Sequence, residues 1–304
     1  MRAHIFYHGD MDGVVSAAMI VRLIGDDGTQ LTPLSYASLG EDWDIYPFNP
    51  NCFNCILDFR CSKSLPQYSP VFLYADHHKT NWVPKETPTS IVLYDSTAPS
   101  CARVVYNAFP DPFFEELTEW ADLVDSAKYE NPRQALLCNE PALRIAAALK
   151  SCSNDARNEL VRLLSYKEFT EVAKEPLVVE KWNKTVRREM RALEYAKRNA
   201  KVIGCVATID YTPVPFTSRY AVFEVYPDIL FSLYLRKQKG RYELSLSCNP
   251  WRPFVGVDLS EIAKMFGGGG HEKAAGITFP DVSSARKVMT RIARVLNEVL
   301  NAPE

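Results

Sequence analysis

The sequence is constrained most by four short apolar segments that each lead into acidic residues. The segments are Ala3–Tyr7, Cys55–Phe59, Val71–Ala75 and Ile91–Tyr94. Their β-branched and aromatic content is typical of buried strands. Helical patterns lie between and after them, at Val14–Ile24, Ala102–Phe109 and Phe113–Ser126. This alternation predicts an α/β fold with a mostly parallel, doubly wound sheet.

Side chains that bind metals are placed where these predicted strands end. They are His8, Asp10 and Asp12 after the first, Asp58 in the second, Asp76, His77 and His78 after the third, and Asp95 after the fourth. In parallel sheets, ligands bind at the carboxyl ends of the strands. Clustered carboxylates repel one another unless cations lie between them. The pattern therefore predicts two bound manganese or magnesium ions, which suit in-line displacement at phosphorus.

Length and charge limit the remaining alternatives. The chain has 304 residues, which is ample for two domains, and a formal net charge of −2, which excludes a globally basic nucleic-acid binder. A local basic groove stays compatible with that charge. The N-terminal residues include no apolar stretch of signal-peptide length, and no run reaches the length of a membrane span. We expect a cytoplasmic protein that does not bind membranes.

The second half of the sequence changes in pattern. Helical residues from Pro132 to about Ser165 precede a long helix, Leu177–Ala200, whose charged face is either a solvated linker or a basic wall beside an anionic substrate. Further strands are predicted at Val202–Ile209, Ala221–Val225, Ile229–Leu235, Tyr242–Ser247 and Ile277–Phe279, with helices at Leu259–Phe266 and Ser283–Leu300. We expect a catalytic domain over 1–190, with a helical connector from about 170, and a smaller α/β domain with a mixed sheet over 200–304.

A run of four glycines followed by His271 stands out in the second domain. Glycines allow the backbone to approach an anion closely, and amide N–H groups can then donate to it. His271 adds a donor that can carry positive charge. Gly268, Gly269, Gly270 and His271 are therefore predicted to bind substrate phosphate, although a flexible turn is the structural alternative.

Three cysteines, Cys52, Cys55 and Cys61, are candidates for a zinc site because two of them form a C-x-x-C motif. A structural zinc ion needs four ligands, and no fourth partner stands at a standard spacing. Ordinary thiols beside a strand are the better interpretation.

Together these motifs resemble the DHH phosphoesterase superfamily. The resemblance rests on His8-x-Asp10-x-Asp12-Gly13, Asp58, Asp76-His77-His78, an acidic motif within 120–127, and Gly267–Gly276, which resembles the DHH-associated C-terminal domain. RecJ-like exonucleases, oligoribonuclease and bisphosphate phosphatases, cyclic-di-AMP phosphodiesterases and exopolyphosphatase-related proteins share such motifs.

The resemblance implies a role for each matched residue. His8 and Asp10 would bind one manganese ion, Asp12 and His77 the other, and Asp58 would bridge both. Asp76 would orient its neighbouring histidine, and His78 would reach the phosphoryl group or the leaving oxygen. These last two are the candidate catalytic residues.

Two positions depart from the family pattern or leave a choice. The acidic ligand of the fourth motif is either Asp122 or Asp125, and the form Asp125-Ser-Ala-Lys-Tyr favours Asp125. Oligoribonuclease relatives carry a phosphate-binding arginine where this chain has Ser247. Arg252 is the candidate to replace it, because a guanidinium matches phosphate in a bidentate manner.

The leading hypothesis is a manganese-dependent phosphohydrolase or phosphodiesterase. Its substrate would be a phosphorylated small molecule or a short single-stranded nucleic acid, including short oligonucleotides and nucleotide bisphosphates. An exopolyphosphatase-like enzyme and a non-catalytic sensor of nucleotides or anions are the alternatives. Magnesium could replace manganese, and the oligomeric state, including a homodimer, stays open.

Overall fold

The computed structural model describes residues 2–35, 48–61, 63, 65, 69, 71–79, 82–238 and 240–301. The chain divides into two compact units. The first comprises Met1–Lys128 and Cys138–Thr185, and the second comprises Tyr129–Leu137 and Val186–Glu304. The division falls within the long helix α10 (Pro176–Asn199). Within the described part of the chain, no helix combines the length and apolar character that a membrane crossing requires.

The first unit is built on a five-stranded sheet. Its strands are β1 (Ala3–His8), β2 (Thr29–Leu34), β3 (Phe53–Leu57), β4 (Phe72–Asp76) and β5 (Ser90–Tyr94). They lie in the order β2-β1-β3-β4-β5, and every neighbouring pair is parallel. Four of the strands match the predicted segments, and all five end at the same edge. The loops that leave this edge carry the candidate ligands.

The fifth strand, β2, was missed in the sequence because Thr29-Gln-Leu-Thr-Pro-Leu34 is half polar and includes a proline. Proline cannot donate a hydrogen bond to a sheet and is tolerated at edges. β2 lies at the end of the strand order, where Pro33 costs little.

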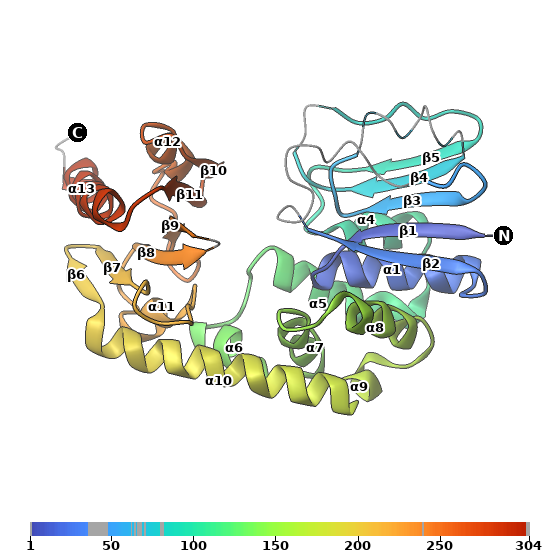
Figure 1. Ribbon diagram of the computed structural model, residues 1–304, viewed down its shortest axis with the longest axis horizontal. Coiled ribbons are helices and arrows are strands. Elements are labelled where there is room, and N and C mark those ends of the chain that lie inside the picture. The colour runs from blue at the N-terminus through green and yellow to red at the C-terminus, as the bar shows by residue number, and fades with distance from the viewer. Residues whose placement is uncertain are drawn as a thin grey trace. The chain divides into compact units, whose positions relative to one another are not determined.

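The described helices of the first unit share one core with the sheet, in which α1, α4 and α8 pack against strands and the other helices pack against helices; Figure 1 shows α1 beside the sheet. They are α1 (Met11–Ile24), α4 (Cys101–Ala108), α5 (Glu115–Asp125), α7 (Pro141–Leu149), α8 (Asn154–Tyr166) and α9 (Phe169–Val172), with a 3₁₀ turn, η1 (Pro112–Phe114), before α5. Alternate residues of β1 point to opposite faces. Ile5 and Tyr7 therefore join the helix-covered core, whereas Phe6 packs in a separate core with Ile56 and Tyr74.

The second unit has a six-stranded mixed sheet, shown with its helices in Figure 1. Its order is β10-β11-β9-β8-β7-β6, and only β7 and β8 run parallel among the described strands. The strands are β6 (Lys201–Ile203), β7 (Val206–Asp210), β8 (Phe231–Gln238), β9 (Arg241–Cys248), β10 (Gly269–His271) and β11 (Ala274–Phe279). The helices are α6 (Pro132–Leu137), the second half of α10, α11 (Ala221–Val225), α12 (Leu259–Lys264) and α13 (Val282–Asn301).

Two predictions for this unit were wrong. The segment predicted as one strand over Val202–Ile209 is a hairpin that turns at Gly204, whose φ of +56° suits glycine. The predicted strand Ala221–Val225 is instead the helix α11. The side chain of Ser218 accepts hydrogen bonds from the backbone N–H groups of Tyr220 and Ala221, which starts a helical turn at this point.

Candidate metal centre

The end of β1, the short loop after it and the first turn of α1 bring His8, Asp10 and Asp12 to the sheet edge. Asp10 caps helix α1, because its side chain accepts a hydrogen bond of 3.2 Å from the backbone N–H of Gly13. A Cβ atom at Gly13 would lie 2.1 Å from the backbone oxygen of His8. Only glycine permits this approach, which allows strand and helix to join within a few residues.

Asp58 follows β3 directly and is buried, with 1% of its surface exposed. Its φ of +56° is rare for a residue with a side chain. The backbone N–H of Asp58 is held by the carbonyl of Ala75 on β4, at 2.9 Å. Residues in such conformations cost about 1–3 kcal/mol and concentrate at functional sites.

Asp76, at the end of β4, has all of its surface buried and its carboxylate well bonded. It accepts hydrogen bonds from the Tyr74 hydroxyl at 2.8 Å, from the backbone N–H groups of His77 and His78 at 2.8 and 3.1 Å, and from Nδ1 of His78 at 2.9 Å. The carboxylate therefore orients the ring of His78. The ring of His77 is oriented by another group, because its Nδ1 donates to the carbonyl of Ala98 at 3.2 Å.

The acidic residues of α5 divide between two environments. Asp125 lies at the sheet edge, where its Oδ2 is 3.4 Å from Nε2 of His77. Asp122 instead accepts hydrogen bonds of 2.6 and 2.8 Å from the Arg103 guanidinium and one of 2.5 Å from the Ser100 hydroxyl. Ser100 is the residue that caps α4. Asp95 lies apart in an exposed turn, accepting from Thr97.

The predicted ligands thus meet in one cluster. Atoms of three groups of side chains lie within 4.8 Å of one another, namely His8 with Asp10 and Asp58, Asp12 with His77 and Asp125, and Asp58 with His77 and His78. Oδ2 of Asp58 is 3.4 Å from Nδ1 of His8, and Oδ1 of Asp58 is 3.7 Å from Nε2 of His77. Asp58 therefore lies between the first group and the second.

Burial and mutual repulsion make this cluster electrostatically unfavourable by itself. Burial raises the pKa of Asp12 and of Asp58 well above the ordinary value, and the neighbouring aspartates raise both further. Burial also raises the pKa of Asp125. Burial tends to raise the pKa of Asp76, but the hydrogen bonds from His78 and Tyr74 and the charge of His78 together lower it. The hydrogen bond with Asp76 raises the pKa of His78. A nearby positive charge would therefore stabilise the candidate ligands Asp12, Asp58 and Asp125 more than it would stabilise Asp76.

The donor set fits divalent cations. Among the described residues, no hydrogen bond reaches either carboxylate oxygen of Asp58 or Nε2 of His77, although all three atoms are buried. Buried polar atoms are normally satisfied, so such atoms need an explanation. Carboxylate oxygens with a few imidazoles suit manganese or magnesium. In the described part of the chain, no cysteine joins a group that could hold a metal, and Cys52, Cys55 and Cys61 form no disulfide there.

The glycine run in the second unit is more ordered than the sequence suggested. The backbone N–H groups of Gly267 and Gly268 are bonded to the carbonyls of Lys264 and Ala263, where they close helix α12. Gly269, Gly270 and His271 form strand β10 beside β11, and Gly270 has a φ of +146°. His271 is exposed.

The predicted phosphate ligand Arg252 already has protein partners. Its guanidinium forms an ion pair with the exposed Asp228 and donates to the carbonyl of Pro227 at 3.0 Å.

Sequence reasoning missed the residues that support the ligands from a distance. Arg157 on α8 donates to the carbonyl of Gly9, 148 positions earlier, and α4 supplies two N–H groups to Asp12. Such contacts carry no sequence signal, because no motif or spacing connects their partners.

No family model and no curated protein matches the chain. Solved structures do. The chain superposes on a pGpG-specific phosphodiesterase, PggH from Vibrio cholerae, with a TM-score of 0.75, 18% identity, and coverage of 98% of this chain and 99% of that one. The DHH domain of a member of a family of ribosomal proteins gives a TM-score of 0.66, 14% identity, and coverage of 100% of this chain and 87% of that one.

A third similar structure is the exonuclease RecJ bound to manganese, with a TM-score of 0.58, 16% identity, and coverage of 99% of this chain and 91% of that one. At these identities the likeness establishes architecture. The chain has the fold of the DHH-domain proteins.

Proposed function

We propose that the chain is a two-metal phosphoesterase that hydrolyses small or terminal phosphoesters. The observation that carries the proposal is the buried Asp58 carboxylate, which lies between two sets of ligands and accepts no hydrogen bond from any described residue. A carboxylate that bridges two cations requires this placement.

The residues that would hold the cations follow from the distances. His8 and Asp10 would hold one ion, Asp12, His77 and Asp125 would hold the other, and Asp58 would be shared. Two ions in such a site supply a hydroxide at neutral pH and stabilise negative charge on the phosphoryl oxygens. We propose manganese as the preferred ion, because the set mixes carboxylates with imidazoles, and magnesium as a weaker substitute.

His78 is the candidate for proton transfer. Its Nδ1 is committed to Asp76, so Nε2 is the nitrogen that can reach a ligand, and the side chain is 33% exposed. The hydrogen bond with Asp76 raises the pKa of His78, which favours the form of the ring that carries a proton on both nitrogens. We infer that the proton on Nε2 is hydrogen-bonded to the phosphoryl group or given to the leaving oxygen. Asp76 is then a positioning residue for His78.

Residues of the second unit are proposed to bind substrate phosphate. Gly269, Gly270 and His271 are the candidates, because the edge strand β10 is exposed at His271. Gly268 is a weaker candidate, since its N–H closes α12. Arg252 could take part only by exchanging its pairing with Asp228 for a phosphate.

A substrate screen with added manganese tests the proposal. The substrates are a short oligoribonucleotide, a nucleoside 3′,5′-bisphosphate and polyphosphate. We expect turnover of the first or second, loss of turnover with EDTA, and recovery with manganese. Turnover of polyphosphate alone would favour the exopolyphosphatase-like alternative. A protein that binds no divalent metal and cleaves none of the three would be a sensor.

The matched variants are Asp58→Asn and Asp95→Asn. Asparagine tolerates the positive φ at position 58, so this change removes charge without a new backbone strain. We expect Asp58→Asn to abolish turnover while far-ultraviolet circular dichroism is unchanged. Asp95 follows β5 of the same sheet but is exposed and outside the cluster, so Asp95→Asn should keep full activity. Full activity in Asp58→Asn would refute the two-metal assignment.

A further inference from the structure

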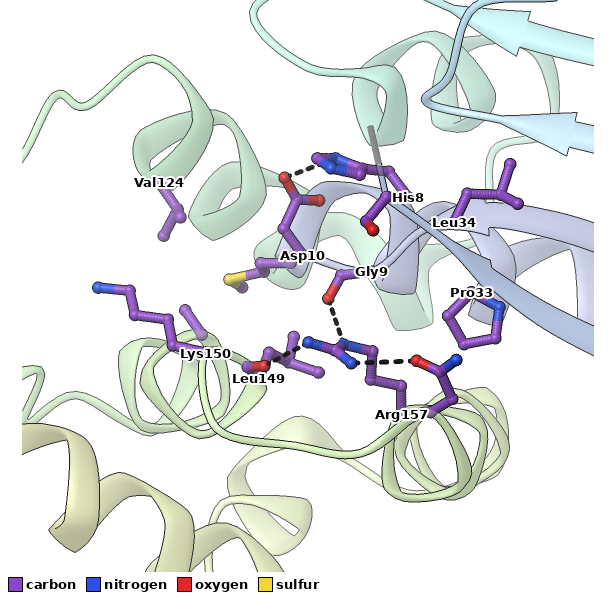
Figure 2. Close-up of a pocket in the computed structure, with 13 residues that line it drawn as sticks. His8, Gly9, Asp10, Pro33, Leu34, Val124, Leu149, Lys150 and Arg157 are labelled. Carbon is purple, nitrogen blue, oxygen red and sulfur yellow. Dashed lines mark hydrogen bonds and ion pairs between the residues drawn. The ribbon is translucent and has the colours of Figure 1, made fainter. Parts of the chain in front are cut away.

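Arg157 on α8 reaches the short loop after β1, between two of the candidate metal ligands. Its Nε donates to the carbonyl oxygen of Gly9 at 2.8 Å. Gly9 is the residue between His8, at the end of β1, and Asp10, which caps α1. Figure 2 shows the guanidinium directed at this carbonyl, with Asp10 and His8 above it in the view. The side chain therefore contacts the peptide that sets how the two ligands lie relative to each other.

The guanidinium of Arg157 is held at two further points. It donates to the carbonyl of Leu149, the last residue of α7, at 3.1 Å, and to Oδ1 of Asn154, the first residue of α8, at 3.3 Å. All three acceptors are neutral, so these hydrogen bonds leave the positive charge of Arg157 in place. A planar group with three donors in use has little freedom to turn. Arg157 thus ties the loop after β1 to the connection between α7 and α8.

Both backbone polar groups of Gly9 are used. Its N–H donates to the carbonyl of Leu34 on β2 at 3.1 Å, and its carbonyl accepts from Arg157. The guanidinium also lies close against the loop, because a Cβ atom at Gly9 would be 3.0 Å from Nε and 3.1 Å from Cδ of Arg157. Such distances are shorter than an ordinary van der Waals contact. The loop is therefore fixed between β2 on one side and Arg157 on the other.

The second candidate metal position is supported by other residues. Asp12 accepts hydrogen bonds from the backbone N–H groups of Cys101 and Ala102, at the start of α4. In the described part of the chain, the hydrogen bonds of Arg157 do not extend to Asp12. One position thus depends on α8 and the other on α4.

We propose that Arg157 is a positioning residue for the metal position formed by His8 and Asp10, acting through the Gly9 carbonyl. The inference rests on the proposed function and adds a residue to it. Arg157 itself binds no cation, because it carries positive charge and only donors. It limits the orientations of the loop, so that less order has to be gained when an ion binds. Loss of Arg157 should weaken this position and spare the one that contains Asp12.

Titration of the metal-free protein with manganese, without substrate, tests the proposal. We expect the wild type to bind two ions, and Arg157→Ala to bind one of them at least about tenfold more weakly. Arg157→Lys keeps the charge but lacks the planar fork, so it should resemble Arg157→Ala. His8→Ala identifies the affected step, because it should weaken the same one. Electron paramagnetic resonance gives a second readout, since two neighbouring manganese ions couple magnetically and a single ion does not.

Arg162→Ala is the matched control. Arg162 lies on the same helix and donates to the carboxylate of Asp26 and to the carbonyl of Thr29, outside the candidate ligand groups. Either substitution removes a guanidinium that ties α8 to another segment, so both should lower the melting temperature in EDTA. Only Arg157→Ala should change the binding of manganese. An equal effect of Arg162→Ala would mean that loosening of α8 is the cause, which overturns the proposal.

Gly9→Ala tests the same contact from the opposite side. The φ of Gly9 is not positive, so alanine suits the backbone, but its methyl group would displace the guanidinium. We expect Gly9→Ala to weaken the same manganese position, and to have little further effect in the Arg157→Ala background. Additive effects would mean that the two residues act independently and would contradict the proposal. Gly9→Ala keeps Arg157, so the test does not depend on how well Arg157→Ala folds.

Activity should follow occupancy of this position. With limiting manganese, Arg157→Ala should lose most of its turnover, and with excess manganese kcat should return to within about threefold of the wild-type value. A guanidinium that acted only on the substrate would leave a defect that manganese does not repair. Persistence of the defect at saturating manganese therefore overturns the positioning role.

The outcomes separate the two proposals. A wild type that binds no manganese contradicts the proposed function itself. A wild type that binds two ions, with both affinities unchanged in a folded Arg157→Ala variant, overturns the role of Arg157 and leaves the two-metal assignment standing. Equal weakening of both positions also overturns it, because Arg157 would then not act through the loop of one position.

Discussion

Two neighbouring strands lead into buried aspartates that differ in their hydrogen bonds and in the direction of their pKa shifts. At the end of β4, Asp76 accepts four hydrogen bonds, and its pKa is lowered. At the end of β3, Asp58 accepts none from the described residues, and burial with repulsion raises its pKa. Both carboxylates are buried to the same degree. Burial alone therefore does not identify a functional carboxylate.

The two carboxylates differ in the partners that stabilise their negative charge. Hydrogen bonds from its own chain satisfy the carboxylate of Asp76, so this side chain can hold the ring of His78 in place. Asp58 is left with two oxygens that accept no hydrogen bond from the described residues, in a strained backbone, an arrangement that a bound cation or a proton makes more favourable. Four predictions test this contrast, beginning with the largest expected effect.

Substitution of the two aspartates should differ most in its effect on the affinity for metal. We expect Asp58→Asn to weaken binding of manganese by about a thousandfold, because a shared ligand is lost from both sets. Asp76→Asn should weaken it by about tenfold, since only an outer support is changed. Isothermal titration with manganese measures both. Equal losses would mean that the contrast between the strand ends has no functional meaning.

Helix α5 carries a similar pair, because Asp122 is bonded to the protein and Asp125, three residues later, belongs to the candidate ligand set. Asp125→Asn should lower kcat by about a hundredfold, because it removes a ligand of the second set. Asp122→Asn should leave kcat within about threefold and cost about 1 kcal/mol of stability, through weaker pairing with Arg103. Steady-state kinetics with manganese decides between them. The reverse ranking would make Asp122 the ligand.

The two substitutions should change the free energy of unfolding of the metal-free protein in opposite directions. Asp76→Asn should destabilise the metal-free protein by about 2–3 kcal/mol, because it weakens a buried ionic network around His78. Asp58→Asn should stabilise it by about 1 kcal/mol, because a repelled buried charge is removed. Urea unfolding in EDTA measures both changes. Destabilisation of the metal-free protein by Asp58→Asn would count against a carboxylate that awaits a cation.

The pH dependence of stability gives the smallest effect. The pKa of Asp58 and of Asp12 is raised in the folded chain, so folded protein holds protons that the unfolded chain releases above about pH 4. The stability from these groups is thus present at low pH and is lost as pH rises through the raised pKa values. The melting temperature in EDTA should fall relative to that with manganese as pH increases. A constant gap between the two curves would contradict this.

The sequence predicted that the candidate ligands lie together, because parallel strands deliver their ends to one edge of the sheet. His8, Asp10, Asp12, Asp58 and His77 were assigned from strand ends and the resemblance, and the structure brings them together. Local chemistry could not show which histidine Asp76 holds. That choice depends on the turn after β4, which directs Nδ1 of His78 toward the carboxylate.

Elements with weak local patterns were not predictable. β2 is half polar, and its place beside β1 comes from pairing across the sheet. Ala221–Val225 has the composition of a strand, but it forms a helix that follows a turn in which the N–H groups of Tyr220 and Ala221 donate to the Ser218 hydroxyl. The glycine run was predicted to bind phosphate, with a flexible turn as the alternative, whereas the N–H groups of Gly267 and Gly268 close α12. In each case a contact outside the segment decided its structure.

The first N–H groups of α4 have a consequence for how the ions would be loaded. Both oxygens of Asp12 accept hydrogen bonds of 2.7 Å, from Cys101 and Ala102. Each oxygen keeps one lone pair, and the donors withdraw electron density from it. Asp10, its counterpart in the other set, accepts one backbone bond of 3.2 Å, and its Oδ2 lies 2.8 Å from Nδ1 of His8. The N–H groups of α4 therefore hold both oxygens of Asp12 in place before an ion binds, whereas Asp10 is held through a ligand of its own set. The two positions should differ in affinity.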